Sequence, residues 1–488
     1  MINHESTVPI PESVQAGLFS RAFEWGRQHH AWLLAGAAIL LLAYRLGLML
    51  ALPLADTTEA RYGEIARLTA SSGFWLMHHI DPQTPFFAKP PLSTWLSAAS
   101  MRLLGVNEFA ARLPSLLASL AAIWVGLGFA RELQVRRRWL VIPVLASCPL
   151  FFISAGAVMT DATQLVVIAA ALYFAWRVLD AADRGLPCRR FRLAFWAMIG
   201  ICALSKGMAS WALVGLPLTA YALLERKPLR MLKQLFDWAG VAIALCIFVP
   251  WYAAAEYYYP GFLNYFIVGE HFSRFLVSGW NGDRYGTAHW QPLGAIWVFW
   301  VAAILPWTVV FLTELARILF RKQRPSSPLE RFLWCATLTP LVFFTFSRNI
   351  IWTYGLTSVL PFAVLAAKWL DDATPSVRFL TGVGIAAVAV VSVLCAPLVL
   401  SNVSGNSDRD LVKAFAREAE PGTNLIYRTR PTFSSSFYTQ GTFRYKPDAA
   451  PIDRVKQYVV IDRQDVESRT IDPRQIIFKG TRRALVEQ

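Results

Sequence analysis

Residues able to do chemistry gather in five short polar segments beside long apolar runs, and the first spans residues 55–64. It contains Asp56, Glu59, Arg61 and Tyr62. Two acids and an arginine at a helix start would supply a general base and a phosphate contact. The same pattern is typical of an ordinary helix N-terminus, where Asp or Thr caps the helix and Glu follows in the first turn. Spacing alone favours this second interpretation.

The second and third segments each carry one charged residue. Lys89 stands before two prolines, which would present its ammonium rigidly to a phosphate. The alternative is a lysine whose stem crosses apolar surface to reach water. Asp161 follows a short turn between two apolar runs. It is interpreted equally well as a helix cap or as a functional carboxylate.

The fourth and fifth segments each present an arginine. If residues 269–275 are helical, Glu270 and Arg274 form an i,i+4 pair, either as a structural salt bridge or with Arg274 directed at an anionic headgroup. His271 lies between them, and a single histidine predicts no metal site. Residues 347–354 carry Arg348 and Tyr354.

The elements that must position these segments are membrane helices. Of 488 residues, 55% are hydrophobic and 16% are charged, against about 25% charged residues in soluble domains. The composition excludes a typical soluble enzyme, and the six cysteines, without a CxxC pair, indicate neither a disulfide framework nor a zinc site. We predict an all-α polytopic membrane protein with about eleven transmembrane helices. The predicted spans are 31–54, 109–130, 139–157, 161–180, 192–205, 208–224, 235–256, 293–316, 332–346, 351–368 and 376–400.

The loops between these spans predict the orientation. Basic residues concentrate in four alternate connections, namely 131–138, 184–192, 226–233 and 317–331. Eleven spans place these connections on one side, which the positive-inside rule makes cytoplasmic, together with the N-terminal segment 1–30. They account for most of the net charge of +15, so that charge records topology and gives no reason to expect a nucleic-acid partner.

The polar segments then face the other side of the membrane. Within the transmembrane domain 31–400, loops 55–108 and 257–292 are long, and the first contains two stretches that we expect to form interfacial helices. Residues 401–488 read as a small α/β domain on the same side. Its expected helix is 408–418, and its expected strands are 424–427, 458–461 and 476–478.

The ordered motifs from about residue 50 to 370 resemble one family. They are Glu59–Ile65, Lys89-Pro90, Asp161, Lys206-Gly207, Pro250-Trp251, Glu270-His271 with Arg274-Phe275, and Leu305-Pro306-Trp307. Together they resemble GT-C glycosyltransferases that use polyprenyl-phosphate sugars, above all the aminoarabinose transferases of lipid A and, more distantly, protein O-mannosyltransferases.

This resemblance implies an inverting hexosyl- or pentosyltransferase in the bacterial inner membrane. The sugar would pass from an undecaprenyl-phosphate carrier, held among membrane lipids, to a periplasmic acceptor such as lipid A, lipopolysaccharide or another envelope glycan. Lys89 and Arg274 would hold the carrier phosphate, with Arg61 and Arg348 nearby, because charge grows on the leaving phosphate. The resemblance requires no cofactor and leaves a divalent cation open.

The acid/base candidates implied by the resemblance are Asp56, Glu59 and Asp161. Further site candidates are Tyr62, Lys206, Glu270, His271 and Tyr354.

Three departures from the family pattern affect this interpretation. Thr58 stands where the family has an Asp before the Glu, so the base assignment stays open between Asp56 and Glu59. Ala88 replaces an acid before the Lys-Pro pair, and the fifth segment has Ile350 and Trp352 where the family has a second basic residue and a proline. These changes suggest a different sugar or acceptor. A hydroxyl acceptor requires a base, whereas a phosphate acceptor does not.

Two other functions fit parts of the pattern. A protein O-glycosyltransferase would use the same donor chemistry. A flippase or transporter of lipid-linked sugars would need broken helices and ionisable residues near the membrane midplane. Because the predicted spans are nearly free of charge and the acids collect in outer loops, the sequence favours an enzyme.

Overall fold

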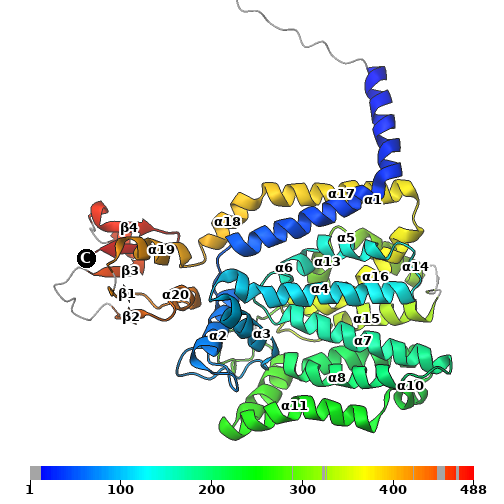
Figure 1. The fold of residues 1–488 in the computed structure, drawn as a ribbon, viewed down its shortest axis with the longest axis horizontal. Coiled ribbons are helices and arrows are strands. Elements are labelled where there is room, and N and C mark those ends of the chain that lie inside the picture. Colours follow the sequence, from blue (N-terminus) through cyan, green and yellow to red (C-terminus); the bar gives the residue numbers. More distant parts are fainter. Residues whose placement is uncertain are drawn as a thin grey trace, which may run out of the picture.

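The computed structural model describes residues 12–287, 289–320, 325, 327–420, 422–447, 457–468 and 472–487. It comprises a bundle of apolar helices and a small C-terminal α/β domain at one end of the bundle (Figure 1). The predicted fold class is confirmed.

Each of the eleven predicted spans coincides with one helix or with two consecutive helices. They are α1 (Glu12–Ala51), α4 (Glu108–Glu132), α5 (Val141–Ser147) with α6 (Pro149–Ser154), α7 (Asp161–Asp183), α8 (Arg189–Lys206), α9 (Met208–Leu224), α11 (Trp238–Tyr258), α13 (Ala295–Ala303) with α14 (Thr308–Phe320), α15 (Pro328–Thr345), α16 (Leu356–Asp372) and α17 (Pro375–Leu394) with α18 (Ala396–Ser404). Within the described ranges, five helices are long and apolar enough to cross a membrane singly: α1 from Gln28, α4, α7, α11 and α17.

The described parts of the four basic connections lie at one end of the bundle, on the right in Figure 1, where α10 (Pro228–Leu235) also lies. The first connection contains the short helix η1 (Arg138–Leu140), and Arg321, Lys322 and Arg324 of the fourth lie outside the described residues. Ion pairs join different connections there. Arg230 contacts Asp183 at 2.6 Å, and Arg331 contacts Glu225 at 2.5 Å. The predicted gathering of these loops on one side is confirmed, while the membrane side that they face stays a prediction.

The polar segments lie at the opposite end. There the chain forms α2 (Thr58–Ser72) and α3 (Leu92–Leu104), a π-helix η2 (Asn264–Ser273) that runs into α12 (Arg274–Leu276), and the 3-10 turn η3 (Trp352–Gly355). Aromatic side chains join the two long loops: the Phe87 ring centroid lies 5.6 Å from that of Phe262, and the Phe86 ring centroid lies 4.7 Å from that of Tyr285. This apolar contact fixes one loop against the other beside the polar residues.

The C-terminal domain is built on a five-stranded sheet. Its elements are α19 (Arg409–Glu418), β1 (Leu425–Tyr427), α20 (Phe433–Tyr438), β2 (Phe443–Tyr445), β3 (Tyr458–Asp462), α21 (Arg463–Ser468), η4 (Pro473–Gln475), β4 (Ile476–Lys479) and β5 (Arg483–Glu487). The strand order is β2-β1-β3-β5-β4, and β1 runs parallel to both neighbours with Leu425 opposite Phe443 and Tyr458. The sequence predicts α19, β1, β3 and β4. It misses α20, β2, α21, η4 and β5.

Candidate active site

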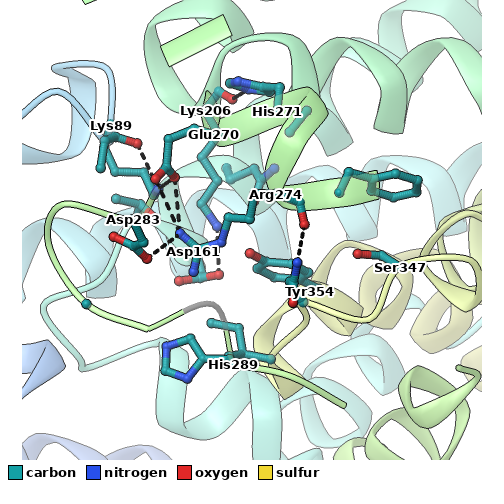
Figure 2. A pocket seen from close by; sticks show the side chains of 18 of the residues that line it. Lys89, Asp161, Lys206, Glu270, His271, Arg274, Asp283, His289, Ser347 and Tyr354 are labelled. Carbon is teal, nitrogen blue, oxygen red and sulfur yellow. Dashed lines mark hydrogen bonds and ion pairs between the residues drawn. The ribbon is translucent and has the colours of Figure 1, made fainter. Parts of the chain in front are cut away.

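A cavity of about 560 Å³ opens at the end of the bundle that carries the polar segments (Figure 2). It draws residues from α2, the Lys89 loop, the start of α7, the α8–α9 turn, η2, the loop after α12 and the residues around η3. The charged residues that line it are Arg61, Lys89, Asp161, Lys206, Glu270, Arg274 and Asp283. Four cations face three carboxylates, so the lining carries one excess positive charge.

Glu270 is the centre of a buried charge network. Its Oε2 accepts from Lys89 Nζ at 3.0 Å and from Arg274 Nη1 at 3.2 Å, and its Oε1 accepts from the Tyr265 hydroxyl at 3.2 Å. Burial alone would raise the pKa of Glu270, but the two cations outweigh burial and hold the pKa below its ordinary value. Glu270 therefore stays ionised and fixes two cations at the cavity wall.

The π-helix and its continuation explain how Glu270 and Arg274 come together. Four residues apart on one helical face, they form the expected pair, and Arg274 also contacts Asp283 at 3.2 Å. Asn349 then closes the end of α12 by donating from Nδ2 to the carbonyls of Arg274 and Val277, both at 2.6 Å. Because the last carbonyls of a helix lack partners within the helix, this contact holds α12 in place.

Two arginines of the cavity lining each have a buried N–H group without a partner among the described residues. Arg61 donates from Nη1 to the Tyr285 carbonyl at 2.5 Å. Its Nε, and the Nε of Arg274, are buried and have no hydrogen-bond partner among the residues that the structure describes. A buried guanidinium N–H without an acceptor is costly. Both guanidinium groups nevertheless contribute positive charge to the cavity lining.

Asp161 and Lys206 form a second pair on the cavity wall. Asp161 is the first residue of α7, and its Oδ1 accepts from Lys206 Nζ at 2.9 Å. The Lys206 ammonium also lies 5.9 Å from the centre of the Tyr354 ring. Both interactions keep a cation beside the network around Glu270.

His271 joins the π-helix to the α8–α9 turn. Its Nδ1 lies 2.7 Å from the Phe266 carbonyl, and its Nε2 lies 3.1 Å from the Lys206 carbonyl. Burial lowers the pKa of His271, although the two carbonyl contacts act against that effect. With both ring nitrogens turned to backbone carbonyls, His271 holds the turn and is poorly placed to move a proton to or from a substrate.

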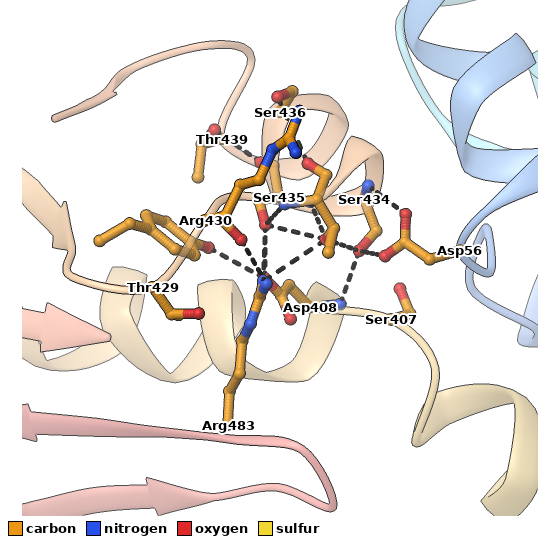
Figure 3. Close-up of polar contacts among 12 residues, drawn as sticks. Asp56, Ser407, Asp408, Thr429, Arg430, Ser434, Ser435, Ser436, Thr439 and Arg483 are labelled. Carbon is orange, nitrogen blue, oxygen red and sulfur yellow. Dashed lines mark hydrogen bonds and ion pairs between the residues drawn. The ribbon is translucent and has the colours of Figure 1, made fainter. Parts of the chain in front are cut away.

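The structure brings most predicted site residues to this cavity and leaves three outside its lining. Arg61, Tyr62, Lys89, Asp161, Lys206, Glu270, His271, Arg274 and Tyr354 line it, whereas Asp56, Glu59 and Arg348 do not. Asp56 binds Ser434 of the C-terminal domain (Figure 3). Glu59 forms two 2.8 Å contacts with Arg112. The Arg348 side chain is exposed, so the fifth segment contributes Ser347, Asn349, Ile351 and Tyr354 instead. We therefore leave Asp56, Glu59 and Arg348 out of the candidate site.

Known proteins with similar sequences or structures support the fold described above. Residues 88–253 match the family model of dolichyl-phosphate-mannose-protein mannosyltransferases. ArnT from Cupriavidus metallidurans has a similar structure both bound to undecaprenyl phosphate, with a TM-score of 0.70, and in the apo state, with 0.71. Each is 20% identical and covers 93% of this chain and 98% of the other. The chain has the GT-C fold. The predicted resemblance is confirmed at that level.

Curated relatives carry one recurring name. The chain is 29% identical over 360 residues to undecaprenyl phosphate-alpha-4-amino-4-deoxy-L-arabinose arabinosyl transferase 1 of Pseudomonas fluorescens, which covers 69% of this chain and 58% of that protein. It is 28% identical over 320 residues to the corresponding transferase of Shewanella sediminis, and this match covers 64% of this chain and 55% of that protein. The chain thus spans less than two thirds of the length of these relatives.

Two residues of this GT-C site escape sequence reasoning. Asp283 contacts Arg274, and the Tyr285 hydroxyl donates to the Pro85 carbonyl at 2.7 Å while accepting from the Phe87 amide at 3.0 Å. Both lie in loop 257–292, where the aromatic content indicates only a membrane interface. No local pattern marks Tyr285, because its partners Pro85 and Phe87 are about 200 residues away. Asp283 is nine residues from Arg274, a spacing that no regular helix brings into contact.

The expectation of a possible divalent cation stays a prediction. Across the described residues, no group of three or more His, Cys, Asp and Glu side chains is arranged to hold a metal ion.

Proposed function

We propose that this protein transfers a sugar from an undecaprenyl-phosphate carrier to an anionic group on a membrane acceptor, such as a phosphate of lipid A. The observation that carries the proposal is one cavity lined by four cations, Arg61, Lys89, Lys206 and Arg274, two of which are arginines. Arginine side chains suit the phosphate of a lipid carrier, because a guanidinium group binds phosphate oxygens through paired N–H donors. The named relatives, which act on such a carrier, support the same donor.

The cavity suits the leaving group of this reaction. An acceptor oxygen attacks the anomeric carbon, the bond from that carbon to the phosphate oxygen breaks, and its electron pair remains on the phosphate. The carrier phosphate changes from a monoanionic diester to a monoester with more negative charge. Arg61, Lys89 and Arg274 would stabilise that growing charge. Lys89 and Arg274 are already held in position by Glu270, and Arg274 also by Asp283.

The charge pairing at the wall favours an acceptor that is already an anion. Within the described part of the cavity, Asp161 is paired with Lys206, Glu270 with Lys89 and Arg274, and Asp283 with Arg274. The two cations beside Glu270 hold its pKa below the ordinary value, which makes Glu270 a weak base. Oxygens of Asp161 and Asp283 are already engaged by the cations that they contact. A phosphate acceptor needs no base and can react at such a site.

A second candidate is a protein O-glycosyltransferase, supported by the match of residues 88–253 to the protein mannosyltransferase family. Its acceptor would be a hydroxyl, and Asp161 would be the base. The two candidate functions predict different effects of Asp161→Asn on kcat. A hydroxyl acceptor predicts a loss of at least about 100-fold in kcat, and Lys206→Met should not reproduce that loss. A phosphate acceptor predicts equal, small losses for both variants.

The transfer reaction is tested with the purified full chain in proteoliposomes that contain undecaprenyl-phosphate aminoarabinose and lipid A. Arg61→Ala and Arg274→Ala should each lower kcat/KM by about 100-fold or more, as expected when one preorganised charge contact is lost. Arg102→Ala is the control, since Arg102 is an exposed cation on α3 outside the cavity lining. Full activity in both arginine variants would contradict the site. No transfer by the wild-type chain, with envelope glycolipids unchanged in cells that lack it, would contradict the proposed donor and acceptor.

We also propose that the cavity faces the periplasm, because the basic connections lie at the other end of the bundle. A periplasm-dependent reporter enzyme fused to the C-terminal domain should be active in cells. Activity only for a reporter inserted between α7 and α8 would reverse the orientation.

A further inference from the structure

The C-terminal domain contacts the transmembrane domain through Asp56. The Asp56 carboxylate accepts from the Ser434 backbone amide at 3.0 Å and from the Ser434 hydroxyl, and the Asp56 amide donates to the Asn406 carbonyl at 2.9 Å (Figure 3). Ser434 lies in the first turn of α20, where a negative charge is stabilised by the aligned backbone dipoles. The N-cap of α20 is Thr432, and Asp56 adds an anion from the other domain that accepts the Ser434 amide of the same turn.

Ser434 is oriented from within its own domain. Its hydroxyl oxygen accepts from the Asp408 amide at 3.0 Å, which leaves its proton for Asp56. The Asp408 side chain in turn accepts from Arg483 and from the Ser435 hydroxyl, both at 2.5 Å. The contact with Asp56 is therefore tied into the sheet of the C-terminal domain through Arg483 of β5.

Apolar packing strengthens the same contact. Phe437 of α20 is 3% exposed and joins the hydrophobic cluster of α2, α3 and α4. The next residue, Tyr438, donates its hydroxyl to Glu108 at 3.1 Å and accepts from the Leu54 amide at 2.7 Å. Burial of one phenylalanine is worth about 1.5–3 kcal/mol, so α20 is held firmly against α2.

Helix α2 consequently lies between the C-terminal domain and the cavity. Asp56 precedes α2 by two residues, and Thr58, Arg61 and Tyr62 of α2 line the cavity. On the cavity side, the Arg61 guanidinium donates a hydrogen bond to the Tyr285 carbonyl. The position of Arg61 therefore depends on what holds the other face of α2.

We propose that Asp56 and Ser434 are positioning residues, through which the C-terminal domain holds α2 so that Arg61 meets the phosphate of the lipid carrier. This inference rests on the proposed function, since it assumes that Arg61 binds that phosphate. It gives the C-terminal domain a role in donor binding, and it gives Asp56 a role other than that of a base.

A double-mutant cycle tests this inference with the full chain in detergent and undecaprenyl phosphate as the probe. Ser434→Ala and Asp56→Asn should each weaken binding of undecaprenyl phosphate by about tenfold, the effect of misplacing one charged contact. In the Arg61→Ala background, the same substitutions should have no further effect. Ser434→Thr, which keeps the hydroxyl, should restore binding. Ser436→Ala is the matched control, because Ser436 lies on the same helix and its hydroxyl donates to the Thr432 carbonyl within its own turn.

The outcomes separate this inference from the proposed function. Unchanged binding in Arg61→Ala would contradict the proposed phosphate site. Weaker binding in Arg61→Ala with wild-type binding in Ser434→Ala and Asp56→Asn would overturn the positioning role. Losses that add to that of Arg61→Ala would overturn it too, because they would reflect general destabilisation. If Asp56→Asn does not fold, Ser434→Ala and Ser434→Thr decide the matter, with thermal unfolding recorded for each.

Discussion

Replacement of Glu59 by Gln should destabilise the protein and leave its chemistry intact. Glu59 contacts Arg112 through two 2.8 Å hydrogen bonds, and the Arg112 side chain is 2% exposed. Removing one partner of a buried ion pair costs about 3–5 kcal/mol, because the other charge stays buried. Arg112 keeps its hydrogen bonds to the carbonyls of Met49, Leu52 and Pro53. We therefore expect a loss near the lower end, about 3 kcal/mol.

The assay for Glu59→Gln compares thermal unfolding with turnover per folded molecule in the same detergent or lipid. A loss of about 3 kcal/mol is a large fraction of the 5–15 kcal/mol that usually holds a domain folded. The control is Asp183→Asn, which breaks the exposed pair with Arg230 outside the predicted spans and should cost less than about 1 kcal/mol. A wild-type unfolding temperature in Glu59→Gln, combined with a 100-fold loss of kcat, would refute the reasoning and indicate that Glu59 takes part in the reaction.

Three further predictions concern the parts that hold the cavity. Gly207→Ala should lower stability and transfer, because Gly207 has a φ of +62° and an added Cβ would lie 2.7 Å from the Phe266 ring; Gly215→Ala, with open space around it, is the control for thermal unfolding. Burial lowers the pKa of His78 to about 4, whereas the unfolded value is about 6.5. The contribution of neutral His78 to stability is therefore complete above about pH 6.5 and is lost as the pH falls towards 4. In His78→Gln the unfolding temperature should change less with pH over that range. Tyr285→Phe removes two hydrogen bonds between the long loops and should cost about 1–3 kcal/mol and weaken undecaprenyl phosphate binding, whereas unchanged binding would show that the aromatic contacts alone hold the loops.

The fold is largely predictable from the sequence because lipid restricts the backbone. An apolar run in a bilayer satisfies its peptide groups only as a helix, so composition and length are enough to place the spans. The α8–α9 turn is also readable, since Lys206-Gly207 interrupts an apolar stretch that is too long for one helix. The basic connections gather at one end because they are alternate connections. Two spans separate each one from the next, so the chain returns to the same side each time.

The candidate site is less predictable because neighbours in sequence take different partners. Glu59 and Arg61 are two residues apart on α2, which separates them by roughly 200° around the helix. Arg61 therefore faces the cavity while Glu59 faces Arg112. Arg348 and Asn349 are adjacent, yet Asn349 is buried at the end of α12 and Arg348 is exposed.

The sequence by itself determines which residue types are present at the end of the bundle opposite the basic connections, and it predicts that Lys89, Asp161, Glu270 and Arg274 lie there. Only the tertiary structure decides which charges pair, and so which remain for a substrate. Asp56 meets Ser434 across 378 residues, and Lys89 meets Glu270 across 181 residues. The reason is physical: the role of a charged side chain is set by the groups within a few ångströms of it, and here those groups come from elements distant in the chain.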